Sequence, residues 1–312
     1  PHFVVLSNAD RTWTQLQLHR LERTYRQFDR YVARLDLPAR PLRHKLVCVL
    51  FSDHKAYHRF ARDHDGVREP WIAGYYAPRH DRVVFYDVAS SPQLRTARAQ
   101  LESMQEESRA IDAMVRERGA ERDPEVAQQL REHRETYRNL LARQEARLEA
   151  YRDAVTAATT LHEATHQLMF HTGVQRTGVQ YPIWLSEGVA TSFETDDPDR
   201  AFGPDTEFAS RRMHFAEMLA SDRLIPLRAL VQFTRMPDSD PDVVRGVYLQ
   251  SYALFTWLNR ARSDALRSYL LSFAALPPGP RTGAELLALF EESFGPVERL
   301  ERRWLAAERG RR

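Results

Sequence analysis

The chain lacks several features that would define its class at once. It has one cysteine in 312 residues, so an intramolecular disulfide framework is excluded. No apolar run approaches the roughly 18 residues that a membrane-spanning helix requires. Its 45 basic and 43 acidic residues nearly cancel and are interspersed, without a basic face carrying interleaved aromatics, so charge does not support nucleic-acid binding. With 43% hydrophobic residues, the chain is expected to bury a substantial core.

The first 90 residues combine strand and helix patterns. The segment HFVVLSN is predicted to be a strand, and residues 11–35 have apolar side chains near helical spacing. Those side chains are Trp13, Leu16, Leu21, Tyr25, Phe28 and Val32. HKLVCVLF, which contains Cys48, is predicted to be a central strand with the cysteine buried, and residues 72–87 a β-hairpin that turns at residues 78–81. A small mixed sheet is therefore expected, in an α+β arrangement.

Composition changes from Ser91 onward. Glycine and aromatic residues become rare, and heptad-like spacing appears in two stretches on either side of the segment RGAERDP. The spaced positions are Leu101, Met104, Ser108, Ile111 and Val115, then Val126, Leu130, His133, Tyr137, Leu141, Gln144, Leu148, Tyr151 and Val155. Asp123 and Pro124 are the expected N-cap and first residue of the second helix. This pattern predicts an inserted antiparallel helical hairpin with arms of roughly 40 Å.

Two interpretations of the hairpin stay open. It is either a self-packed insertion with a solvated outer face or an arm that docks a protein partner or substrate. The polar seam residues His133 and Gln144 are interpreted as tolerated register markers rather than ligands. The second helix has no breaker before LHEATHQLMF, so that stretch is expected at the end of one very long helix.

The remainder of the chain is predicted to be mostly helical, with proline and glycine clusters between the helices. The predicted helices cover residues 207–220, 226–234, 246–261, 265–276, 282–295 and 297–309. Four parts follow: residues 1–90 as the sheet, 91–152 as the hairpin, 153–195 as two motif helices, and 196–312 as a helical C-terminal subdomain.

The stretch LHEATHQLMF contains the pattern His-Glu-x-x-His. On a helix, His162 and His166 lie on one face and can both present an imidazole nitrogen to one metal ion. Glu163 projects beside that face, where it can act as a general base toward a metal-bound water. Because such a pattern arises by chance in roughly one chain in thirty of this composition, it needs a third ligand.

The segment YPIWLSEGVATSFE offers that ligand. It begins with a helix-start proline, Pro182, and carries Glu187 among apolar residues. A buried, unpaired carboxylate is costly, whereas Zn²⁺ would satisfy it and leave a fourth position for water. Gly188 is expected to let a second helix approach closely. A metal-free reading of this segment as an ordinary amphipathic helix is the alternative.

The combination of HExxH and, about twenty residues later, W-L-x-E-G-x-A resembles the gluzincin metallopeptidases, which include thermolysin and the aminopeptidase N relatives. The resemblance implies that His162, His166 and Glu187 are zinc ligands. The order of segments along the chain, apart from residues 91–152, also resembles a bacterial family of predicted zinc peptidases of unassigned function. Such families are often extracytoplasmic, and the start at Pro1 is compatible with a removed leader.

A peptidase of this kind also needs a donor for the oxyanion. Tyr248 in YLQSYAL matches best, with Tyr252 and Tyr181 as rivals. Thr191 and Glu194 are candidates for orienting the imidazoles. The histidine five positions after His166 is expected at a helix end rather than on the metal, and histidines 44, 54, 58, 64 and 80 are expected on the surface.

These expectations converge on zinc-assisted amide hydrolysis. The metal would activate water and polarise the carbonyl, Glu163 would take the water proton and pass it to the leaving amine, and Tyr248 would stabilise the oxyanion. The exposed edge of the β-hairpin at residues 72–87 would align an extended peptide substrate. Since the aminopeptidase signature is absent, an endopeptidase is favoured. The alternative is a non-catalytic or latent zinc-binding assembly protein that uses the helical hairpin to bind a partner.

Overall fold

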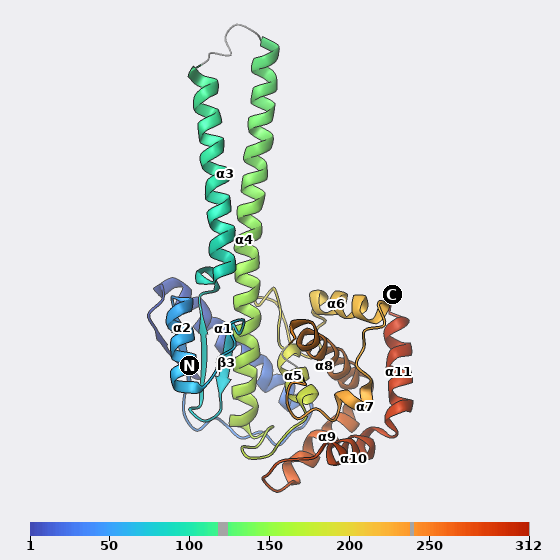
Figure 1. Ribbon diagram of the computed structural model, residues 1–312. Coiled ribbons are helices and arrows are strands. Elements are labelled where there is room, and N and C mark those ends of the chain that lie inside the picture. The colour runs from blue at the N-terminus through green and yellow to red at the C-terminus, as the bar shows by residue number, and fades with distance from the viewer. Residues whose placement is uncertain (118–123, 238–239, 312) are drawn as a thin grey trace. The chain divides into compact units, whose positions relative to one another are not determined.

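The computed structural model describes residues 1–117, 124–237 and 240–311 (Figure 1). The chain forms two compact units. The first contains residues 1–50, 71–85 and 157–312, and the second contains residues 51–70 and 86–156. Residues 51–70, which the sequence grouped with the N-terminal sheet, are thus part of the same unit as the helical hairpin. The expected N-cap Asp123 lies outside the described residues.

A four-stranded mixed sheet forms near the N-terminus, as predicted, in the order β1-β2-β4-β3. The strands are β1 (Phe3–Ser7), β2 (Leu46–Phe51), β3 (Gly74–Ala77) and β4 (Arg82–Tyr86). β1 pairs in parallel with β2, and β3 pairs antiparallel with β4. β2 is internal and buries Cys48, so both predictions for this strand are confirmed. β3 lies at an edge of the sheet.

The first helix, α1 (Arg11–Arg34), packs against the sheet. It begins where the carboxylate of Asp10 accepts a hydrogen bond from the backbone N–H of Trp13 at 2.9 Å. Phe28 and Val32 are buried as the spacing predicted, and they join the main core. Leu16 is 42% exposed, because the buried stripe of this helix does not extend to its position.

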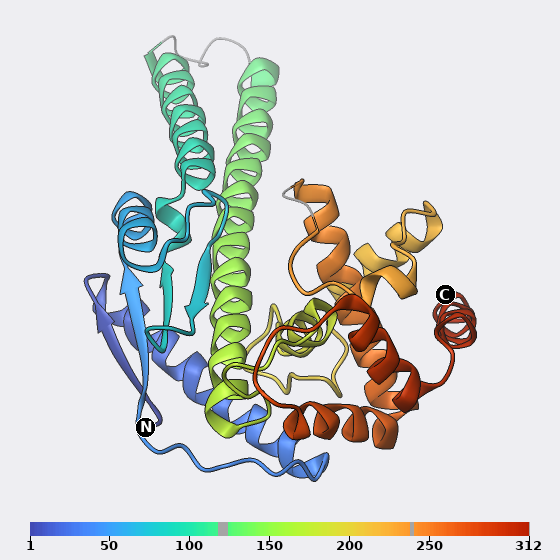
Figure 2. The same ribbon diagram turned by 60° about the horizontal axis from the view of Figure 1, so that its bottom comes forward.

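The second unit contains the predicted helical hairpin. Its elements are α2 (His54–Phe60), the π-helical turn η1 (Ala61–Asp65), the 3₁₀ turn η2 (Val88–Ser90), α3 (Pro92–Glu117) and the first part of α4 (Pro124–Thr172). Figures 1 and 2 show α3 alongside this part of α4. The sequence pattern did not indicate α2, whose N-cap is the side chain of Asp53.

The contacts along the hairpin differ from the predicted seam. His133 and Gln144 are exposed, and Tyr151 is 60% exposed, so these three positions do not lie in a packed interface. Leu101 and Leu141 are buried, and ion pairs supply further contacts, with Arg134 2.5 Å from Asp112 and Arg98 2.6 Å from Glu149. Two helices alone cannot cover every position of a heptad pattern, which leaves one side in solvent.

The C-terminal part is helical, as predicted. Its helices are α5 (Ile183–Ser192), α6 (Ala209–Ala220), α7 (Leu227–Leu230), α8 (Pro241–Ala261), α9 (Ser263–Ala275), α10 (Gly283–Phe294) and α11 (Val297–Arg309). α5 packs extensively on α8, and α8 also contacts α6 and α9. The prediction of a helix over residues 226–234 is wrong in length, because α7 is shorter. It ends at Leu230, and the carbonyl of Phe233 accepts a hydrogen bond from the N–H of Ile183 at 2.8 Å instead.

Within the part of the chain that the structure describes, none of the helices combines the length and apolar character needed to cross a membrane. α4 is a single helix of 49 residues, and the HExxH stretch lies near its C-terminal end, as the sequence predicted. The last part of α4, from residue 157, belongs to the first unit together with α5 and α8.

Candidate metal centre

The two histidines of HExxH lie on one face of α4, where their separation of one helical turn brings the rings together. The ring centroids are 4.8 Å apart, and the two Nε2 atoms are 3.1 Å apart. Both side chains are largely buried, with 9% of His162 and 15% of His166 exposed. Two imidazole nitrogens that face each other this closely form either a shared-proton pair or two ligands of one cation.

Glu187 on α5 completes a group of three. Its Oε2 atom lies 3.2 Å from Nε2 of His162 and 3.6 Å from Nε2 of His166. Ligand atoms bound tetrahedrally to zinc at its usual bond lengths are about 3.3 Å apart. The three donor atoms therefore have the spacing of three corners of a zinc tetrahedron.

The chemistry of the donors also fits a cation. Oε2 of Glu187 is buried and receives no hydrogen bond, a costly state for a carboxylate oxygen. Two neutral imidazoles and one carboxylate match the donor set of an open catalytic zinc site. The side chains retain 9–15% exposure, so water can reach them. On these observations the residues present fit Zn²⁺.

His162 is held in one tautomer by Glu194. Nδ1 of His162 lies 2.9 Å from Oε1 of Glu194, and since a carboxylate accepts, Nδ1 donates. In the neutral ring the lone pair is therefore on Nε2, facing the other donors. The second oxygen of Glu194 accepts from the guanidinium of Arg211 on α6, at 2.9 Å from Nε and 2.5 Å from the terminal nitrogen. Glu194, one of two residues that the sequence suggested for orienting an imidazole, therefore contacts one.

Thr191, the other residue suggested for this role, does not contact an imidazole. Its hydroxyl donates to the backbone carbonyl of Glu187 at 2.5 Å, within its own helix. A threonine one turn after Glu187 bonds back to the preceding turn because that carbonyl is the nearest acceptor. Arg211 was missed, because nothing distinguishes it from the other arginines of the chain in the sequence.

The pKa values of His162 and Glu187 follow from their burial and from the charges around them. Burial disfavours a charged imidazole, but the nearby carboxylates of Glu187 and Glu194 outweigh it and raise the pKa of His162 well above its usual value. Burial likewise opposes ionisation of Glu187, yet the nearby imidazoles of His166 and His162 lower its pKa. The surroundings thus favour positive charge on His162 and negative charge on Glu187. A bound cation would take the place of the positive charge on His162.

Glu163 lies beside the three donors rather than among them. Its Oε1 is 4.0 Å from Nε2 of His162, and its Oε2 accepts a hydrogen bond from the backbone N–H of Tyr76 at 2.8 Å. Burial is the main influence on its pKa, which is raised above the usual value despite the attraction of His162 and His166. A carboxylate with a raised pKa is a better proton acceptor near neutral pH.

The hydrogen bond from Tyr76 also affects the prediction that an edge of the β-hairpin at residues 72–87 aligns an extended peptide. β3 is an edge strand, as that idea requires, but the N–H of Tyr76 is already used by Glu163. Sequence patterns could not reveal this contact, because it is made by a backbone group of a residue 87 positions before Glu163.

Tyr248 on α8, the best match among the three tyrosines named from the sequence, lies beside the centre. Its ring centroid is 5.9 Å from that of His162. The negative charge of Glu187, followed by burial, raises its pKa well above the usual value, so its hydroxyl stays protonated and able to donate.

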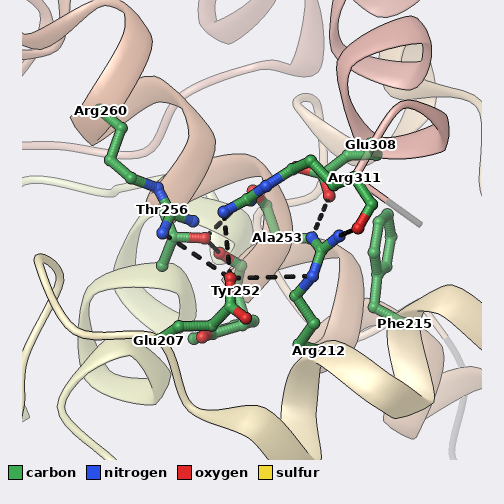
Figure 3. A pocket seen from close by; sticks show the side chains of 9 residues that line it. All are labelled: Glu207, Arg212, Phe215, Tyr252, Ala253, Thr256, Arg260, Glu308 and Arg311. Atoms are coloured by element: carbon green, nitrogen blue, oxygen red, sulfur yellow. Dashed lines mark hydrogen bonds and ion pairs between the residues drawn. The ribbon is translucent and has the colours of Figure 1, made fainter.

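The two rival tyrosines are used elsewhere. The hydroxyl of Tyr252 accepts from the N–H of Phe208 at 2.9 Å, and that of Tyr181 accepts from the N–H of Arg176 at 2.8 Å. Figure 3 shows Tyr252 among charged side chains, where Glu207 and Glu308 face arginines of α6, α8 and the C-terminal end. These side chains leave room for little more than a water molecule, which suits structural packing rather than a substrate.

Gly188, next to Glu187, permits a close approach, but to a different helix than expected. A Cβ at this position would lie 2.8 Å from Cβ of Phe255 and 2.8 Å from the carbonyl oxygen of Ser251, both on α8. The sequence suggested closeness between the two motif helices. The structure shows that the glycine brings α5 against α8, the helix that carries Tyr248.

Comparison with protein-family models gives a match over part of the chain. Residues 156–278 match the family described as "Protein of unknown function (DUF1570)", which covers less than half of the chain. The matched region includes the end of α4, α5 and α8, and so contains His162, Glu187 and Tyr248. No curated protein matches the chain, and no solved structure matches it.

Proposed function

We propose that this protein is a zinc-dependent metallopeptidase, with endopeptidase action favoured. The observation that carries the proposal is the group formed by His162, His166 and Glu187, whose donor atoms lie 3.1–3.6 Å apart beside the carboxylate of Glu163. The resemblance of HExxH and W-L-x-E-G-x-A to gluzincins supports the same assignment, as does the uncharged hydroxyl of Tyr248. An extracytoplasmic location, suggested by that resemblance, is part of the proposal.

The roles of the residues follow from their positions. His162, His166 and Glu187 would hold Zn²⁺, which when bound supplies Lewis acidity toward a carbonyl and lowers the pKa of water. Glu163 would accept the proton of the attacking water and return it to the leaving amine. Glu194 and Arg211 would keep His162 in the tautomer with its lone pair on Nε2. Tyr248 would donate a hydrogen bond to the oxyanion as it forms.

The direct test is cleavage of a peptide library by the purified protein after loading with zinc, with and without a chelator. We expect endoproteolytic cleavage that the chelator removes and added zinc restores. If the zinc-loaded protein cleaves nothing, the alternative of a zinc-binding assembly protein is favoured. The helical hairpin exposes the apolar side chains of Ile111, Leu140 and Tyr151, which such a protein could use to bind a partner.

Tyr248→Phe tests the oxyanion donor. Loss of one such donor costs roughly 100- to 1,000-fold in kcat, and KM should change little because the ring remains. The control is Tyr252→Phe, which removes the acceptor of the Phe208 N–H and should lower stability by about 1 kcal/mol while leaving kcat intact. Steady-state kinetics of both variants decide between them, and a larger loss in Tyr252→Phe would reject the role of Tyr248.

A further inference from the structure

A second cluster of metal-ligand residues lies outside the proposed catalytic group. His44, Asp81 and His171 each offer one ligand atom, and these atoms lie within 4.8 Å of one another. The three residues come from the loop before β2, the β3–β4 turn and the C-terminal end of α4, all within the first unit. We infer that His44, Asp81 and His171 form a second site for a divalent transition-metal cation.

Asp81 is fixed in place by its surroundings. Nε2 of His171 lies 2.6 Å from Oδ1 of Asp81, and the hydroxyl of Tyr76 donates to the same oxygen at 3.3 Å. The backbone of Asp81 has a left-handed φ of 50°, and its carbonyl accepts from the side-chain amide of Gln167 at 3.3 Å. The carboxylate is therefore positioned in advance, and a cation that binds here would displace the proton that Nε2 of His171 donates to Asp81.

His44 presents a nitrogen with a defined lone pair. Its Nδ1 lies 3.2 Å from the carbonyl oxygen of Lys45, and because a carbonyl only accepts, Nδ1 is the protonated nitrogen. The lone pair is therefore on Nε2, the atom left to bind a metal. The ring of His44 lies 5.1 Å from that of His171, edge to face. As His44 is exposed, a change of side-chain torsion can bring Nε2 closer to the other two ligand atoms.

The donor set indicates the class of ion. Two imidazoles and one carboxylate suit zinc, copper and nickel, whereas calcium and magnesium prefer sites made of oxygen donors. With three protein ligands and an exposed histidine, the site would be open to solvent and weaker than the buried group of His162. An ion there would tie the β3–β4 turn to the end of α4.

One residue, Tyr76, connects this second site to the proposed catalytic group. The hydroxyl of Tyr76 contacts Asp81, and the backbone N–H of Tyr76 contacts Glu163. The existence of the second site does not depend on the proposed peptidase function, so its test measures metal alone.

The experiment is equilibrium dialysis of the untagged full chain against buffered Zn²⁺ in excess Mg²⁺, with metal counted by mass spectrometry. We expect two zinc ions per chain in the wild type, and at least about tenfold weaker binding of one of them in His171→Ala and in His44→Ala. His80→Ala is the matched control, since it removes an exposed histidine next to Asp81 that is not in the cluster, and it should still bind two.

His166→Ala separates this inference from the proposed function. It should lose the tight ion and keep the weaker one. A wild type that binds one ion, or His171→Ala and His44→Ala that bind zinc as the wild type does, would overturn the second site. If His166→Ala binds as the wild type does while His171→Ala loses an ion, the second site stands and the proposed catalytic zinc group fails.

Discussion

Glu163→Gln is expected to lose peptide cleavage while keeping its fold and its zinc. The glutamine has the size of the glutamate but cannot accept the water proton, and the loss of a general base costs roughly 100- to 10,000-fold in rate. Its amide oxygen can still accept the hydrogen bond from the N–H of Tyr76. The substitution also removes a negative charge close to Glu187, whose charge helps to raise the pKa of Glu163, so folding should not suffer.

The measurements are kcat on the best library peptide, zinc content and thermal unfolding. Glu145→Gln, which changes an exposed glutamate of the same helix in the same way, is the control and should match the wild type in all three. Full activity in Glu163→Gln would reject the proposed mechanism. Loss of zinc together with activity would show instead that Glu163 supports the metal group.

Removal of zinc from the wild type is expected to lower its thermal stability as well as its activity. A ligand bound only by the folded state stabilises it by about 2.7 kcal/mol when its free concentration is 100 times Kd, which corresponds to several degrees in Tm. The metal-free protein should still fold, because Glu187 and Glu194 can then pair with a protonated His162, as the raised pKa of that imidazole indicates.

His166→Ala provides the comparison for this second prediction. It removes one of the three donors, so most of the change in Tm on chelation should disappear, while His80→Ala should respond as the wild type does. The measurement is Tm with a chelator, with buffered zinc, and after zinc is added back. An undiminished response in His166→Ala would mean that the stabilising ion binds somewhere other than at this group.

The sequence predicts only in part that the site residues lie close together. His162 and His166 share a helix, so their spacing alone brings them to one face. Glu187 was predicted from its segment, a carboxylate among apolar residues one helix later. Tyr248 was chosen by resemblance, and its position near His162 depends on the packing of α8 against α5, which Gly188 permits.

Contacts between distant segments could not be predicted. Tyr76 reaches Glu163 through a backbone N–H, which every non-proline residue has, so no sequence signal marks it. Arg211 is one arginine among many. His44, Asp81 and His171 are so far apart along the chain that no ligand spacing connects them, and the surface position predicted for His44 is correct without revealing its neighbours.

The sequence by itself determined the order of the strands and of the long helices, the internal position of β2, the long helix ending in HExxH and the helical C-terminal part. Those features follow from local periodicity, capping and chain breakers, which act over a few residues. Tertiary structure alone decided the early end of α7, the exposure of His133 and Gln144, the pairing of Glu194 with Arg211 and the contact of Tyr76 with Glu163. Each of these depends on a hydrogen bond or packing contact with a residue that is distant in the sequence. Local sequence patterns do not identify that residue.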